Sequence, residues 1–105
     1  MENSFYFRDN QLYCEDISIQ ELASEYSTPA YIYSKNKILN QYRDFRAAFK
    51  DIPSLICFSV KSNSNISILK LLSDEGSGMD IISGGELFRT VKAGTDPQKI
   101  VYSGP

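Results

Sequence analysis

Apolar and polar positions follow a regular order in the second half of the chain. Three short apolar runs, each bounded by polar residues, predict buried strands. They lie at residues 55–60, 79–83 and 99–103. Between them, apolar residues recur at helical spacing and predict helices over residues 66–75 and 84–93. This strand–helix unit repeats at slightly more than 20 residues, which predicts parallel strands joined by right-handed crossovers.

The first part of the chain carries different signals. Residues 5–14 place aromatic side chains on each side of Arg-Asp-Asn-Gln, which predicts a hairpin because Asp and Asn tolerate turn geometry. Residues 19–26 predict a short helix capped by Ser18, and residues 30–34 predict a strand. Ser34 is placed to cap a further helix. The aromatic residues of this part are predicted to be core: Tyr31, Tyr33, Tyr42, Phe45 and Phe49.

Together these units predict an α/β fold. The repeat is short and no Gly-x-Gly-x-x-Gly motif opens a helix, so we expect the N-terminal portion of a (β/α)₈ barrel rather than a Rossmann fold. A complete barrel takes about 250 residues. An open parallel sheet is unstable without partners for its edge and faces. We therefore expect the 105 residues to be the N-terminal part of a longer protein.

Composition and charge limit the classes of partner and the cellular compartment that we expect. The formal net charge is −2 with no long run of one sign, which argues against nucleic acid or a membrane surface as the main partner. No apolar run is long enough to span a bilayer, and the start lacks the features of a signal peptide. Cys14 and Cys57 are then expected to be reduced thiols of a cytoplasmic protein. The chain has no histidine, which excludes a Ser-His-Asp triad and a His-containing metal site within it, and we predict no metal.

Polar positions follow each predicted strand, where the active site of such a barrel lies. They are Lys61, residues 83–86 and residues 103–105. For Lys61 the simplest interpretation is a solvated lysine at a strand end, and spacing alone favours it. The alternative is a reactive amine, because a partly desolvated lysine at a barrel mouth is nucleophilic and condenses with a carbonyl group of a cofactor or substrate.

Two carboxylates lie near these strand ends. Asp80 falls inside the second apolar run, where the simplest interpretation is an edge position or a hydrogen-bonded carboxylate. A carboxylate within a barrel strand is costly unless paired, and a lysine from the neighbouring strand is a natural partner. Glu86 and Ser83 have the spacing of a capping box, which on sequence alone is favoured over a binding role, although both roles can coexist. Gly84 and Gly85 either let a ligand approach the backbone or simply form a tight turn.

Four segments of the chain, in order, resemble segments of one enzyme family. Residues 58–65, FSVKSNSN, resemble the lysine segment of the alanine-racemase-like (fold type III) pyridoxal-phosphate enzymes. Residues 76–87, GSGMDIISGGEL, resemble a segment of the diaminopimelate decarboxylases within that group. Residues 27–34 and 99–105 resemble their first barrel strand and the strand that precedes a Gly-x-x-Lys turn. The combination, at family spacing over residues 4–105, is specific.

The resemblance implies a pyridoxal 5'-phosphate-dependent decarboxylase. Lys61 would form a Schiff base with the cofactor and later act as acid and base. Asp80 and Glu86 would lie near both, and Ser83 and Gly84 would adjoin the cofactor. The implied reaction removes the carboxylate at the D-centre of meso-2,6-diaminopimelate and gives L-lysine and carbon dioxide, the last step of lysine biosynthesis. The implied partners are an amino-acid substrate, the rest of the enzyme chain and a second copy in a homodimer.

The same resemblance divides the chain and leaves alternatives. Residues 1–30 would form the hairpin and short helix that associate with a C-terminal β domain, and residues 31–105 would form the first units of an incomplete barrel. The chain alone is expected to be inactive, because other family binding residues lie beyond Pro105. Ser59 and Ser62 replace alanines that are usual in the family. The alternatives are an ornithine/arginine-type or carboxynorspermidine-type decarboxylase, a non-catalytic barrel that binds the cofactor, and a chain with only a structural or interaction role.

Overall fold

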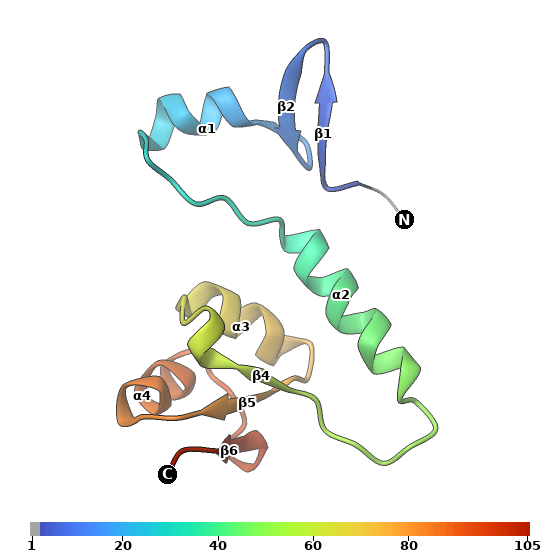
Figure 1. Ribbon diagram of the computed structural model, residues 1–105, viewed down its shortest axis with the longest axis vertical. Helices are drawn as coiled ribbons and strands as arrows, with labels where there is room; N and C mark the ends of the chain where they lie inside the picture. The colour runs from blue at the N-terminus through green and yellow to red at the C-terminus, as the bar shows by residue number, and fades with distance from the viewer. Residues whose placement is uncertain (1–2) are drawn as a thin grey trace. The chain divides into compact units, whose positions relative to one another are not determined.

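The computed structural model describes residues 3–105, so residues 1 and 2 of the predicted first domain lie outside the described part. The elements, in chain order, are β1 (Phe5–Arg8), β2 (Gln11–Cys14), β3 (Ile17–Ser18), α1 (Ile19–Tyr26), α2 (Lys35–Ala48), β4 (Cys57–Ser59), the 3-10 turn η1 (Val60–Ser62), α3 (Ile66–Asp74), β5 (Gly78–Ile81), α4 (Gly84–Lys92), the 3-10 turn η2 (Pro97–Lys99) and β6 (Ile100–Tyr102) (Figure 1). The chain forms two compact units, and the boundary between them lies between Gln41 and Tyr42. Within residues 3–105, no helix is long and apolar enough to cross a membrane.

The first unit begins with the predicted hairpin. Strands β1 and β2 pair antiparallel, and β3 adds a short third strand. The turn residues Asp9 and Asn10 have φ values of 52° and 62°, the left-handed region that Asp and Asn tolerate better than most residues. Helix α1 follows at once, with Ser18 Oγ accepting a hydrogen bond from Glu21 N at 3.3 Å. The hairpin and the cap of α1 are therefore confirmed.

Glu15 joins the hairpin to the start of α2. Its Oε2 accepts hydrogen bonds from Ser34 Oγ at 2.9 Å and from Asn36 N at 3.2 Å. Ser34 Oγ in turn accepts from Lys37 N at 3.0 Å, which confirms the predicted cap. Two polar side chains from distant parts of the sequence thus satisfy backbone donors that a helix start leaves free.

Two predictions for this part of the chain are wrong. Residues 30–34 form no strand, because a strand needs a neighbour for its hydrogen-bond ladder and the described strands of the first unit, β1 to β3, pair only with one another. The aromatic residues are mostly not core either. Tyr31 is 91% exposed, and Tyr42 is half-buried. The others, exposed as well, are Tyr33, Phe45 and Phe49. Their apolar surface has no covering element in this part of the protein.

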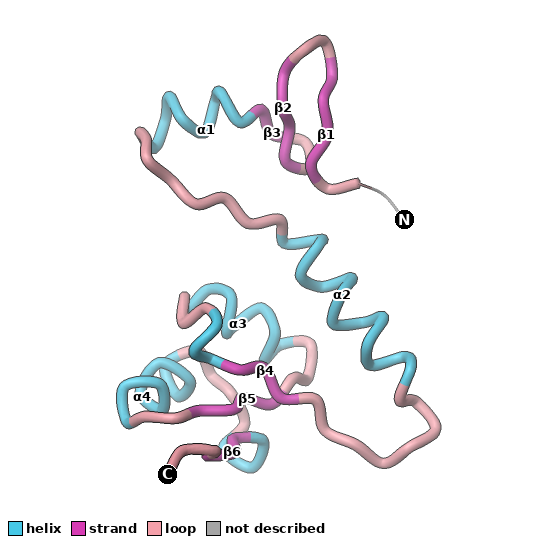
Figure 2. Tube along the Cα trace, viewed as in Figure 1, coloured by secondary structure: helices cyan, strands magenta, loops and turns pink. Residues whose placement is uncertain are grey.

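The second unit contains the predicted repeat. Strands β4, β5 and β6 are parallel and lie in sequence order, with α3 and α4 as the crossovers (Figure 2). Asn65 caps α3 by accepting from Ser67 N at 2.9 Å. Gly76 and Gly94 follow α3 and α4 with φ values of 105° and 87°, the left-handed conformation that commonly ends a helix. The three parallel strands, both helices and their ends confirm the sequence pattern.

The C-terminal half of α2 is bound to the end of α3. Arg43 donates to Glu75 from Nε at 2.8 Å and from Nη2 at 2.9 Å. Arg46 Nη1 donates to Glu75 O at 2.9 Å. The hydrogen bond and charge of Arg43 hold the pKa of the Glu75 carboxyl below its usual range.

The β4–β5–β6 sheet has two different faces. Side chains alternate along a strand, so Met79 and Ile81 share one face of β5 while Gly78 and Asp80 share the other. Met79 is 0% and Ile81 is 5% exposed. Helix α4 packs on β5 and α3 packs on α4, so the helices bury this side. We call the side with Met79 the covered face and the side with Asp80 the open face.

Gly78 on the open face is required by close packing. A Cβ at this position would lie 2.6 Å from Lys99 O and 2.7 Å from Cys57 Sγ. Real Cβ atoms do not approach other atoms so closely, and the carbonyl belongs to the backbone and cannot rotate away. The glycine therefore lets the chain before β6 approach β5.

Candidate active site

The carboxyl ends of three parallel strands lie along one edge of the sheet. Lys61 follows β4, Ser83 lies two residues beyond β5, and Ser103 follows β6 directly. Because the strands are parallel and in register, these positions belong to the same edge. The structure therefore brings the three predicted strand ends to one side of the sheet.

Lys61 stands in the middle of the 3-10 turn η1. Ser62 Oγ donates to Ser59 O at 2.7 Å, and Asn63 N donates to Val60 O at 3.1 Å. Val60 is 0% exposed and anchors the turn in the core. Within residues 3–105 the Lys61 amine makes no hydrogen bond and no ion pair, and the side chain is exposed. The turn is thus held on both sides, while the desolvation predicted for a reactive amine is not present in this chain.

The Ser/Asn cluster after Lys61 orders the loop that leads to α3. Asn63 Oδ1 accepts from Asn65 N at 3.1 Å, one step before the Asn65 cap. Arg89 on α4 donates from Nη1 to Ser64 O at 3.2 Å. Short polar side chains that bond nearby backbone are typical of tight turns. The cluster and Arg89 together fix the path of the chain that leaves Lys61.

Asp80 lies on the open face of β5, half-buried, opposite Ser59 of β4 and Val101 of β6. Ser103 Oγ donates to Asp80 Oδ1 at 2.5 Å. The hydrogen-bonded interpretation of Asp80 is thus confirmed, and no ion pair of Asp80 with a lysine occurs among the described residues. A hydroxyl from the next strand satisfies the carboxylate instead. The sequence predicts that Ser103 lies at a strand end but does not predict this contact. The available signal is that Ser103 lies two residues beyond Val101, the partner of Asp80, and therefore on the same face of the sheet.

Glu86 takes part in the predicted helix cap. Glu86 N donates to Ser83 Oγ at 3.1 Å, and Glu86 Oε1 accepts from Ile82 N at 3.1 Å. This confirms the capping interpretation, with the carboxylate reaching one residue earlier than in the usual box. Gly84 begins α4, and apart from its own helix backbone and chain neighbours no atom of residues 3–105 lies within 4 Å of the position where its Cβ would stand. The space beside Gly84 is therefore open, as close approach of a ligand to the backbone would require.

Cys57 is a further reactive group on the open face. Partial burial raises the pKa of its thiol, and the nearby Asp80 charge raises that pKa further. A thiol in such surroundings is mostly protonated and a poor nucleophile. Of these two groups, the Lys61 amine therefore stays the candidate for chemistry at this edge, and Cys57 does not.

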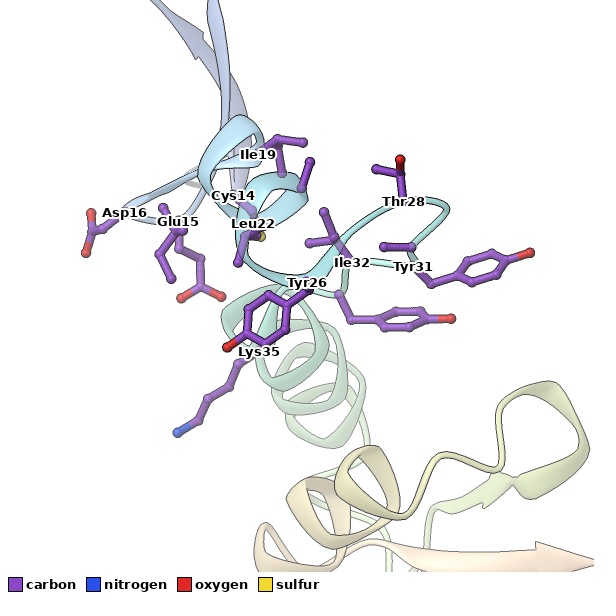
Figure 3. Close-up of a pocket in the computed structure, with 14 residues that line it drawn as sticks. Cys14, Glu15, Asp16, Ile19, Leu22, Tyr26, Thr28, Tyr31, Ile32 and Lys35 are labelled. Carbon is purple, nitrogen blue, oxygen red and sulfur yellow. The ribbon is translucent and has the colours of Figure 1, made fainter.

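The first unit contains a cavity of about 650 Å³. It lies between α1 and the extended segment that follows, and Figure 3 shows Leu22, Tyr26 and Ile32 beside it. None of the predicted site residues lines it. Its walls are mainly apolar side chains, with Glu15, Asp16 and Lys35 as the charged residues among them. The cavity is accordingly not the candidate active site.

Comparison with known proteins assigns the chain to one family. The chain belongs to the pyridoxal-dependent decarboxylases, since a sequence model described as "Pyridoxal-dependent decarboxylase, pyridoxal binding domain" matches residues 35–105. The relatives it resembles are diaminopimelate decarboxylases, as the segment from Gly76 to Leu87 predicts. The predicted fold class is likewise confirmed, because the chain matches the N-terminal portion of the barrel domain of these enzymes.

Three comparisons give the extent of the similarity. The diaminopimelate decarboxylase of Haemophilus influenzae is 46% identical over 102 residues, which are 97% of this chain and 25% of that protein. The crystal structure of AQ1208 from Aquifex aeolicus gives a TM-score of 0.91 at 45% identity, over 97% of this chain and 25% of that one. The diaminopimelate decarboxylase of M. jannaschii, solved with L-lysine, gives 0.91 at 29% identity over the same shares. The chain thus spans about a quarter of the length of these relatives.

The residues at the sheet edge fit pyridoxal phosphate. Its reactive group is an aldehyde, and Lys61 offers a primary amine that has no hydrogen-bond or ion-pair partner within residues 3–105. Asp80 supplies a carboxylate on the neighbouring strand, at the position opposite Ser59. The backbone at Gly84 is unobstructed. An amine, an adjacent carboxylate and open space along one edge are the features that such a cofactor needs from this part of a barrel.

Proposed function

We propose that this chain is the lysine-bearing part of a diaminopimelate decarboxylase and that Lys61 holds pyridoxal phosphate. The observation that carries the proposal is the setting of Lys61. Its amine is exposed and unpaired within the described residues, on a hydrogen-bonded turn at the carboxyl end of β4. A lysine that merely leaves the core would be equally exposed. What favours the proposal is that the match to a pyridoxal binding domain, over residues 35–105, includes Lys61.

The residues of the edge have distinct roles in this proposal. Pyridoxal phosphate, when bound, supplies an aldehyde for an amine and a ring that draws electrons from the α-carbon of an amino acid. Lys61 Nζ would hold the cofactor at its aldehyde carbon, and the Lys61 amine would later carry a proton to or from the substrate. The charge of Asp80 would orient the Lys61 ammonium group. Glu86, Ser83 and Gly84 adjoin the cofactor from the start of α4.

The substrate assignment is meso-2,6-diaminopimelate, with L-lysine and carbon dioxide as products. Relatives that carry the name diaminopimelate decarboxylase support it, at 43–47% identity across most of this chain. A structure of the M. jannaschii enzyme with L-lysine, the product that this reaction would give, adds support. We further propose that the full-length protein is a cytoplasmic homodimer.

Covalent trapping tests the role of Lys61. The full-length protein is incubated with pyridoxal phosphate and reduced with borohydride, and the modified peptide is found by mass spectrometry. We expect modification at Lys61, and we expect Lys61→Ala to lose both the modification and the activity by at least about 10²-fold, the effect of removing a positioned acid–base group. Lys70→Ala is the matched control, because Lys70 is an exposed lysine of α3 paired with Asp74 at 3.2 Å.

Carbon dioxide release tests the substrate. We expect it from meso-2,6-diaminopimelate and not from ornithine, arginine or carboxynorspermidine. Preference for one of those compounds would overturn the substrate assignment and leave the lysine assignment intact. Modification of Lys61→Ala at the wild-type level would overturn the lysine assignment.

A further inference from the structure

Asp80 and Ser103 come from different strands and meet at the active-site edge. Ser103 N donates to Ile81 O at 3.1 Å, which extends the ladder between β5 and β6 beyond Tyr102. Asp80 is opposite Val101, and Ser103 lies two residues further along, on the same face. The backbone therefore brings the Ser103 hydroxyl to the Asp80 carboxylate, and Ser103 Oγ donates to Asp80 Oδ1 at 2.5 Å.

This hydrogen bond sets the orientation of the carboxylate. Across residues 3–105, Asp80 makes no other side-chain hydrogen bond and no ion pair. A carboxylate without a partner rotates freely about its side-chain torsions, and one short bond to a backbone-fixed hydroxyl selects a single orientation. Serine at position 103 contributes little else, since its side chain is exposed and fills no core space.

We propose that Ser103 is a positioning residue, which holds the Asp80 carboxylate in the orientation that directs the Lys61 amine toward the cofactor aldehyde. The inference rests on the proposed function, in which Asp80 orients Lys61. Among residues 3–105 the Ser103 side chain forms its hydrogen bond with Asp80 and none with the Lys61 amine, so in this inference its influence passes through Asp80. Its loss leaves the fold in place and makes bond formation at Lys61 slower, because fewer encounters find the amine correctly oriented.

The experiment measures cofactor capture rather than turnover. Full-length protein freed of cofactor is mixed with pyridoxal phosphate, and the rise of the visible absorbance gives a second-order rate. For Ser103→Ala we expect a rate about tenfold below wild type, as for the loss of one hydrogen bond to a charged group. Ser103→Thr keeps the hydroxyl, and we expect it to stay within about twofold of wild type.

A double variant separates positioning from structure. If Ser103 acts through Asp80, then Ser103→Ala added to Asp80→Asn changes the capture rate by less than about twofold. Ser54→Ala is the matched control, because Ser54 is an exposed serine before β4 whose side chain forms no hydrogen bond among residues 3–105. Ser103→Ala and Ser54→Ala are expected to unfold at the same urea concentration as wild type.

Each other outcome is decisive. Three outcomes would overturn the inference, provided that wild type still captures the cofactor. Ser103→Ala could leave the rate unchanged, or Ser103→Thr could lose as much rate as Ser103→Ala. The tenfold loss could also persist when Ser103→Ala is added to Asp80→Asn. Failure of the proposed function has a different signature. In that case wild type shows no rise in absorbance, or Lys61→Ala captures the cofactor as fast as wild type, and this inference falls with it.

Discussion

Met79 and Asp80 are neighbours on β5 with opposite surroundings. Met79, on the covered face, is 0% exposed, among the most deeply buried side chains of the described chain. Asp80, on the open face, is half-buried and accepts a hydrogen bond from Ser103. The alternation of a strand thus separates packing from chemistry within one residue of sequence. Substitutions on the two faces are therefore expected to affect different measurements.

The largest difference is expected between Met79→Ala and Asp80→Asn. Met79→Ala removes a fully buried side chain and is expected to cost about 2–5 kcal/mol of unfolding free energy. Asp80→Asn keeps the size and an acceptor for Ser103, so it is expected to cost less than about 1 kcal/mol and yet to slow cofactor capture. Urea denaturation and the capture rate of the full-length protein are the two measurements. If Asp80→Asn were the more destabilising change, the division between the faces would be wrong.

A smaller effect of opposite sign is expected from Thr90→Val, beneath the covered face. Thr90 on α4 is 0% exposed, and its Oγ1 has no hydrogen-bond partner within residues 3–105. An unpaired buried hydroxyl costs about 1–3 kcal/mol, so valine is expected to raise the free energy of unfolding by about 1 kcal/mol.

Thr95→Val is the matched comparison for Thr90→Val. Thr95 is also buried, but its Oγ1 shares a hydrogen bond with Ser73 Oγ at 2.6 Å. Valine there leaves the Ser73 hydroxyl without its partner, so a lower urea midpoint is expected. Equal shifts in the same direction for both variants would show that hydrogen-bond satisfaction does not govern stability on this side of the sheet.

The smallest expected effect concerns the open face and depends on pH. Burial and then the charge of Asp80 raise the pKa of Cys57, so less thiolate is present at a given pH than for an unperturbed thiol. Asp80→Asn removes the negative charge, lowers the pKa of Cys57 and is expected to speed its alkylation by iodoacetamide near pH 8. Cys14 serves as an internal control, because burial and the charge of Glu15 raise its pKa and Asp80 does not contribute. A change at both cysteines would mean that the substitution loosened the fold.

The repeat of the second unit was predictable because its signals are local. Apolar runs, caps such as Asn65 and helix ends such as Gly76 are set by residues a few positions apart. The strand at residues 30–34 was predicted wrongly for the opposite reason, since a strand depends on a neighbour that this part of the chain does not supply. The burial predicted for the aromatic side chains of α2 was wrong for the same reason, because burial depends on what packs against a helix.

The sequence indicates which residues to propose for the site, but it predicts their contacts less well. Position after a strand and resemblance to a family indicated Lys61, Asp80 and Glu86. A hydrogen-bonded Asp80 was among the predictions, but its donor Ser103 was missed because the register of β6 was unknown. The contacts of Glu86 were predictable, because the local spacing Ser83-x-x-Glu86 is enough to predict the cap of α4 without knowledge of the tertiary structure.

The hydrogen bonds around Lys61 and Asp80 also differ in the length of chain that each must close. Those that hold the Lys61 turn join residues two or three positions apart, as between Ser62 and Ser59. The bond from Ser103 to Asp80 spans 23 positions. Closing a longer loop costs more chain entropy and requires β6 to have joined the sheet. During synthesis from the N-terminus, the residues of the short-range hydrogen bonds at the Lys61 turn are therefore all present before Ser103 has been added.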